Sequence, residues 1–111
     1  MAVAVLMRLP GVRQEQYDRL IGLCGLDDDP AVGQILHLCM ETPDDVEFVE
    51  IWQTRQTALA FVEQRLKPAL QLLGVADEPN VWIFALRNLF APDIETIERI
   101  GSVSTPAGGD A

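Results

Sequence analysis

The single histidine and one glutamate have the residue types and the spacing that suit acid–base chemistry. His37 lies in the apolar run ILHLC, and Glu50 lies in the run VEFVEIWQ that follows the turn sequence TPDD. If residues 42–45 form the loop of a hairpin, Glu41 pairs with Val46 and His37 lies directly opposite Glu50. A carboxylate there would orient the imidazole and stabilise its cation. His37 could then act as a general base toward a phenol or a 1,3-dicarbonyl.

The register of this hairpin decides which side chains accompany the histidine. A loop of any even length keeps Phe48, Glu50 and Trp52 on its face, whereas an odd loop or a bulge would exchange them for Val49 and Ile51. A structural alternative also fits the pattern. The histidine and the glutamate would then be a satisfied polar pair in the sheet or at a dimer interface, because buried polar groups need partners whatever the function.

Other candidate site residues would surround this pair. Tyr17, on the apolar stripe of a predicted helix, could donate a hydrogen bond to a substrate carbonyl or a forming enolate, although a core tyrosine fits the same position. Cys39 alternates with the histidine, and Phe48 and Trp52 share its face in the favoured register. We predict these three as ligand-binding residues, with Trp52 as an aromatic wall. Asn88, near the end of the last predicted strand, could bind ligand oxygens.

Common metal and cofactor motifs are absent from the sequence. No spacing of cysteine and histidine suits zinc, and neither a glycine-rich phosphate loop nor a Gly-x-Ser-x-Gly elbow occurs. The acidic run at residues 27–29 lacks the spaced ligands of a calcium loop. We therefore expect no metal site and chemistry without a metal or prosthetic group.

Composition narrows the class of protein. The chain has 111 residues, of which 49% are hydrophobic and 23% charged, which predicts one globular domain. Its net charge of -9 disfavours nucleic acid and anionic lipid, and no apolar run approaches the ~20 residues that span a bilayer. Residues 2–7 lack the basic flank of a secretory signal, and Cys24 and Cys39 suit reduced thiols. We expect a cytoplasmic protein with no nucleic-acid or membrane partner.

Hydrophobic periodicity predicts the elements that position the candidate residues. Strands are predicted over residues 2–9, 34–41, 46–53 and 80–91, and helices over residues 13–26, 55–73 and about 93–100. Pro68 predicts a kink or a break near Arg65 in the long helix, whose inward stripe begins at Leu59. The small residues over 102–111 predict a disordered tail after a single domain of residues 1–101.

This order, β-α-β-β-α-β, is the ferredoxin-like motif of an α+β fold with a four-stranded antiparallel sheet. Both main helices would cover one face of the sheet. The strands are largely apolar on both faces, so the other face needs a partner. Pairing of two copies through their sheets, as a homodimer, is the simplest solution.

With this order in place, the sequence resembles the dimeric α/β barrel superfamily, which includes antibiotic-biosynthesis monooxygenases, polyketide cyclases and small stress-responsive proteins. The resemblance covers about residues 2–90 and rests on Ile51-Trp52, on Ala58, Phe61 and Leu66, and on Pro68-Ala69-Leu70. It implies a dimeric α/β barrel that holds a small organic molecule between helices and sheet. Some members are oxygenases without metal or prosthetic group. Haem-degrading members place an axial histidine on a helix, which a histidine in a predicted strand does not match.

Three functions are compatible with these residues. The first is an enzyme that oxygenates or cyclises an aromatic or polyketide-like substrate, with His37 as base, Glu50 as its orienter and Tyr17 as donor. The second is a non-catalytic, ligand-binding or stress-responsive dimer. The third is a purely structural dimer whose cleft is filled by aromatic side chains such as Trp82 and Phe61.

Overall fold

In a computed structural model of the chain, four strands form one antiparallel sheet in the order β2-β3-β1-β4. The strands are β1 (Val3–Leu9), β2 (Gln34–Met40), β3 (Val46–Trp52) and β4 (Asn80–Ala85). The helical segments are η1 (Gln14–Gln16), α1 (Tyr17–Leu23), α2 (Arg55–Phe61), η2 (Val62–Leu66), α3 (Lys67–Leu73) and α4 (Ile94–Ile100). The structure describes residues 1–26, 28–43 and 45–100, so the predicted tail over residues 102–111 lies outside the described residues.

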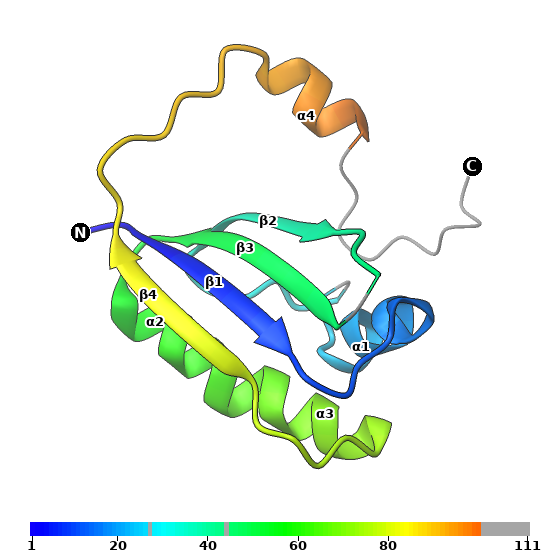
Figure 1. The fold of residues 1–111 in the computed structure, drawn as a ribbon. Coiled ribbons are helices and arrows are strands. Elements are labelled where there is room, and N and C mark those ends of the chain that lie inside the picture. The colour runs from blue at the N-terminus through cyan, green and yellow to red at the C-terminus, as the bar shows by residue number, and fades with distance from the viewer. Residues whose placement is uncertain (27, 44, 101–111) are drawn as a thin grey trace.

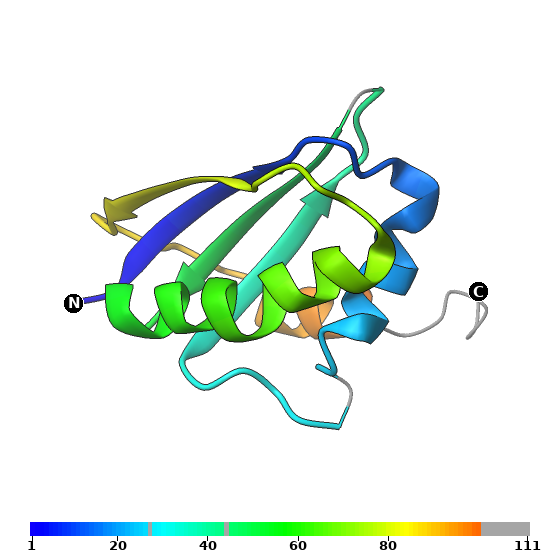
Figure 2. The same cartoon turned by 90° about the horizontal axis from the view of Figure 1, so that it is seen from below.

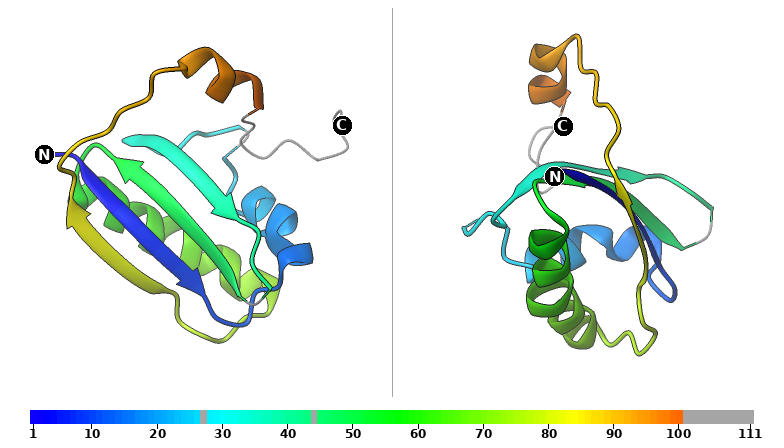
Figure 3. Two further views of the ribbon diagram at one scale, coloured as in Figure 1. Left: turned by 45° about the horizontal axis from the view of Figure 1, so that its top comes forward. Right: turned by 90° about the vertical axis from the view of Figure 1, so that its left-hand side faces the viewer.

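The elements form two main layers (Figure 1). Helices α1, α2 and α3 cover one face of the sheet, as the view from below shows (Figure 2). Helix α4 lies on the opposite side of the sheet, which is otherwise open (Figure 3). The predicted α+β, ferredoxin-like order of elements is therefore confirmed.

Alternation along β1 and β3 builds the core between the layers. One residue in two faces the helices, and the buried hydrophobic residues of this kind are Val3, Val5, Met7, Leu9, Val46, Phe48 and Trp52. The first three strands lie within one residue of their predicted bounds at each end. Pairing of β2 with β3 places His37 opposite Glu50, so the favoured hairpin register is also confirmed.

The long helix differs from its prediction in the middle and in its buried face. The expected kink or break at Arg65 is a π-helical turn, η2, which widens the helix ahead of Pro68. A π turn contains one residue more than an α-helical turn. The residues that face the core ahead of the turn are therefore shifted by one position from those that regular α-helical spacing predicts. Leu59, predicted to face inward, is therefore 39% exposed, and its neighbour Ala58 is buried instead.

The last strand is shorter than predicted. It ends at Ala85 rather than at residue 91, because Ala85 pairs with Val3, the first residue of β1, and no strand continues beyond it. Asn88 and Phe90 consequently lie in the connection to α4.

Helix α4 forms where a short docking helix is predicted, but none of its residues is buried. No helix in the described part of the chain is long and apolar enough to cross a membrane.

Candidate functional site

Three side chains from three elements form a continuous chain of hydrogen bonds. The hydroxyl of Tyr17, at the start of α1, lies 2.6 Å from Nε2 of His37 on β2. Nδ1 of the same ring lies 2.6 Å from Oε2 of Glu50 on β3. The structure therefore brings together the three residues that the sequence suggested as base, orienter and donor.

Glu50 is fully buried and is surrounded by hydrogen-bond donors. Besides His37, the indole N–H of Trp52 donates to Oε1 at 2.8 Å and the amide of Gln34 donates to Oε2 at 3.3 Å. A carboxylate can only accept, and its two oxygens can accept from all three of these groups. With Glu50 as a carboxylate, Nδ1 of His37 carries a proton and donates it to Oε2, and Nε2 of the neutral imidazole is then the acceptor for the Tyr17 hydroxyl.

Packing holds the tyrosine and the imidazole in place. The Phe48 ring meets the His37 ring edge-on, with centroids 4.7 Å apart, and the Tyr17 ring at 5.7 Å. Burial, reinforced by the nearby Cys39 and Glu50, raises the pKa of Tyr17 above its usual range. Tyr17 therefore keeps its proton at neutral pH, in agreement with its role as donor to the imidazole.

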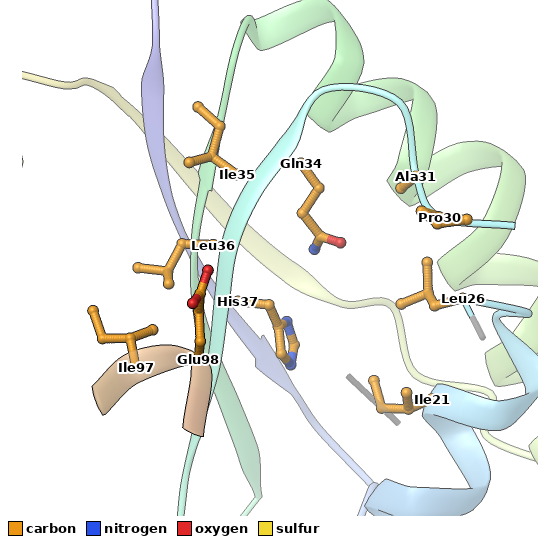
Figure 4. A pocket seen from close by; sticks show the side chains of 10 residues that line it. All are labelled: Ile21, Leu26, Pro30, Ala31, Gln34, Ile35, Leu36, His37, Ile97 and Glu98. Carbon is orange, nitrogen blue, oxygen red and sulfur yellow. The ribbon is translucent and has the colours of Figure 1, made fainter. Parts of the chain in front are cut away.

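An open cavity of about 380 Å³ runs along the free edge of β2 beside this chain. On the helix side, Ile21, Leu26, Pro30, Ala31, Gln34 and His37 line it. Leu36 and Ile97, the latter from α4, lie on the other side of the strand (Figure 4). Ile21 is one helical turn after Tyr17 on α1, so the same face of that helix carries the tyrosine and one wall of the cavity. The volume suits a small organic molecule.

Gln34 belongs to the site although the sequence prediction omitted it. We expected Ile35, His37 and Cys39 to share one face of the strand, but the pairing is irregular between Gln34 and Leu36. This bulge leaves Ile35 half-exposed and turns Gln34 toward Glu50. The available signal in the sequence is the preceding Gly33, which adopts a positive φ of 86°.

Gly33 should be the most sensitive glycine of this region. A Cβ atom added to it would lie 2.6 Å from the Thr57 hydroxyl and 2.8 Å from the Cβ of that residue, in addition to the strain of its positive φ. We expect Gly33→Ala to lower the free energy of unfolding, measured in urea, by at least about 2 kcal/mol. The matched control is Gly22→Ala, which meets nothing within 4 Å on α1 and should stabilise by about 0.5 kcal/mol. Equal effects of the two variants would contradict this interpretation.

None of the four predicted ligand-binding residues lines the cavity. Trp52 and Phe48 are buried in the core, where Trp52 holds Glu50 and packs against Phe61, so Trp52 is not an exposed aromatic wall. Cys39 is half-buried next to Phe48 in the sheet register. Asn88 is exposed after β4 and does not join the group around His37. The residues that line the cavity are different ones.

Within residues 1–26, 28–43 and 45–100, no group of three or more histidine, cysteine, aspartate or glutamate side chains is arranged to hold a metal ion. Cys24 and Cys39 are free thiols, and burial raises the pKa of each to about 11. Both therefore remain protonated at neutral pH.

Known structures share this fold at low sequence identity. No protein-family model matches the sequence, and no curated protein matches it. A protein of unknown function from Nitrosomonas europaea is 16% identical, with a TM-score of 0.62 over 82% of this chain and 94% of that one. SnoaB, a cofactor-independent oxygenase from Streptomyces nogalater, is 10% identical, with a TM-score of 0.57 over 80% of this chain and 95% of that one.

A candidate antibiotic biosynthesis monooxygenase from Chloroflexus aurantiacus is also similar. It is 11% identical, with a TM-score of 0.58 over 82% of this chain and 98% of that one. At such identities, these similarities establish the fold alone. They confirm the resemblance at the level of the fold.

Proposed function

We propose that this protein is an enzyme that abstracts a proton from a small aromatic or polyketide-like molecule without a metal or prosthetic group. The observation that supports it best is the chain Tyr17–His37–Glu50, with both hydrogen bonds at 2.6 Å, beside a largely apolar cavity. The cofactor-independent oxygenase SnoaB has the same fold, which adds support for chemistry of this class.

The proton would travel through the tyrosine hydroxyl. Tyr17 uses its one hydrogen toward Nε2 of His37, so its oxygen retains lone pairs that can accept a proton from the substrate. As that proton arrives, the original hydroxyl proton moves to Nε2, and Glu50 stabilises the imidazolium through Nδ1–H. The substrate is left as an enolate or phenolate in the largely apolar cavity.

Two reactions can follow from that anion. In a cyclisation, the enolate carbon attacks a carbonyl carbon of the same molecule, and the proton held by the site returns to the alkoxide. In an oxygenation, dioxygen is the co-reactant: an acidic CH₂ group becomes C=O, and the second oxygen atom leaves as water with the two hydrogens.

The direct test is a screen of the purified protein against phenols, 1,3-dicarbonyls and aromatic ketones with an acidic CH₂ group. Each compound is incubated in air and under nitrogen, and the products are identified by mass spectrometry. Oxygenation predicts a product that gains one oxygen and loses two hydrogens in air only, whereas cyclisation predicts an isomer under both gases. Compounds that bind in the cavity but return unchanged under both gases would contradict the enzyme proposal.

A ligand-binding protein without catalysis is the second candidate. The observation that favours it is the Tyr17 hydroxyl itself, which occupies Nε2 and leaves His37 no free nitrogen. A stress-responsive binding protein would use the cavity without turnover. The screen separates the two candidates because it records binding and conversion for each compound.

We further propose a homodimer formed through the open face of the sheet. Apolar side chains on that face are partly exposed: Leu38 at 41%, Trp82 at 43% and Phe84 at 57%. Leu38 lies on the edge strand β2 and the two aromatic residues lie on the opposite edge strand β4, so the apolar surface spans the sheet. A second copy placed face to face would cover it, which favours a dimer over a monomer in water.

A charge in this face should therefore prevent association. We expect Trp82→Glu to be a monomer in sedimentation equilibrium while the unchanged protein is a dimer, because the glutamate would be buried unpaired at the interface. The control is Leu72→Glu, at a residue that is 68% exposed on α3, in the helical layer, and should leave the dimer unchanged. A monomeric unchanged protein would overturn the dimer proposal.

A further inference from the structure

We propose that Gln34 selects the ligand of the cavity, by accepting a hydrogen bond through its side-chain oxygen from a phenolic or enolic hydroxyl group other than the group that loses its proton to Tyr17. The inference deepens the proposed function and rests on it in one respect, namely that the cavity beside His37 holds a small molecule.

The first step is the orientation of the Gln34 amide, which the neighbouring carboxylate fixes. Oε2 of Glu50 can only accept, so the group that faces it at 3.3 Å must be the NH₂ of Gln34. The amide oxygen then points away from Glu50. No described residue donates a hydrogen bond to that oxygen, and Gln34 lines the cavity. The cavity therefore contains a hydrogen-bond acceptor of fixed orientation.

The second step is the rigidity of the segment that carries the amide. The backbone N–H of Gln34 donates to the carbonyl of Ala31 at 3.3 Å, and the carbonyl of Gly33 accepts from the N–H of Gln53 at 2.8 Å. These bonds hold the residues just before the bulge, one to the preceding loop and one to the residue that follows β3. The side chain is half-buried and also tied to Glu50, so the acceptor is positioned before a ligand arrives.

The third step is the apolar character of the surroundings. Ile21, Leu26 and Ala31 face Gln34 and His37 across the helix side of the cavity (Figure 4). Both nitrogens of His37 are already engaged, one with Tyr17 and one with Glu50. A ligand that fills this space removes water from the Gln34 oxygen, and an acceptor desolvated without a donor costs free energy. A ligand with a hydroxyl group there avoids that cost, whereas one without it does not.

The expected ligand is therefore a largely apolar molecule that presents a hydroxyl donor, such as a phenol or the enol form of a dicarbonyl. A methyl ether of the same molecule keeps the shape of the ring but loses the donor. The comparison of a phenol with its methyl ether thus isolates the proposed contact.

We would measure the dissociation constants of 1-naphthol and 1-methoxynaphthalene by calorimetry on the unchanged protein. The naphthol should bind about tenfold more tightly, the ratio that one satisfied acceptor provides. Gln34→Met removes the acceptor at similar volume, and we expect both dissociation constants to come within about threefold of each other. The control is Gln71→Met, on the exposed side of α3, which should keep the tenfold preference.

The outcomes separate this inference from the proposed function. No preference on the unchanged protein, or a preference that survives Gln34→Met, overturns the role of Gln34 even if the screen finds turnover. A preference for the naphthol that depends on Gln34, without any turnover in the screen, supports the hydrogen bond to Gln34 and contradicts only the proposal that the protein is an enzyme. The comparison on the unchanged protein requires no variant, so the absence of a preference there overturns the inference even if Gln34→Met fails to fold.

Discussion

His37→Ala should lose turnover by at least about 100-fold while the protein stays folded, because the base that receives the substrate proton is gone. The ring is partly exposed, and its removal takes one of three donors from Glu50, while Trp52 and Gln34 continue to hold the carboxylate. The lost hydrogen bonds should cost about 1–3 kcal/mol of unfolding free energy. Initial rates on a substrate from the screen, together with urea unfolding, measure both quantities.

A second variant tests the route of the proton. Tyr17→Phe keeps the ring that packs against Phe48 but removes the hydroxyl that bonds to Nε2. If the hydroxyl relays the proton, Tyr17→Phe loses turnover about as severely as His37→Ala. If the substrate reaches Nε2 directly, Tyr17→Phe retains or exceeds the original rate, since the competing hydroxyl is absent. Full activity of His37→Ala would contradict the catalytic assignment of the histidine.

The relation of His37 to Glu50 could be predicted because local rules determine it. A four-residue turn sequence fixes the parity of a hairpin, and alternation then fixes the faces of both strands. The structure pairs these two residues as expected and adds Tyr17 from the apolar stripe of α1. Sequence periodicity can predict which residues pair in a hairpin, because that pairing depends on residues that are close in sequence.

The features that escaped prediction depend on contacts between distant segments. The bulge that turns Gln34 inward accompanies a glycine that lies against Thr57 on α2, and no local pattern announces that contact. Likewise, β4 ends at Ala85 because β1 begins at Val3, a limit set by a partner strand far away in sequence. Trp52 is an aromatic residue of the type that often lines a ligand site. Only its burial and its hydrogen bond to Glu50 identify it as a support for that carboxylate. Alternation predicts a face, but the depth of a side chain on that face depends on the helices above it.

Glu50 should be the residue whose replacement has the largest combined effect on stability and activity. Glu50→Leu would leave the indole N–H of Trp52 and the Nδ1–H of His37 buried without an acceptor. Each donor left unsatisfied costs about 1–3 kcal/mol, so we expect a loss of about 2–6 kcal/mol of unfolding free energy, measured in urea. A loss below about 1 kcal/mol would show that the network contributes little to the fold.

Glu50→Gln separates the electrostatic role of this residue from its role in packing. The amide has nearly the shape of the carboxylate, and its oxygen can accept from Trp52, but its NH₂ then faces Nδ1 of His37 and must donate to it. The imidazole proton would move to Nε2, the atom that has to accept the hydroxyl proton of Tyr17, and the hydrogen bond to Tyr17 would reverse. We expect turnover to fall by about 10²–10⁴-fold, with a smaller loss of stability than in Glu50→Leu. Nitrogen NMR of the labelled imidazole reports the exchange of tautomers directly. An unchanged tautomer together with a full loss of activity would contradict this account, because the carboxylate would then act on something other than the proton position of His37.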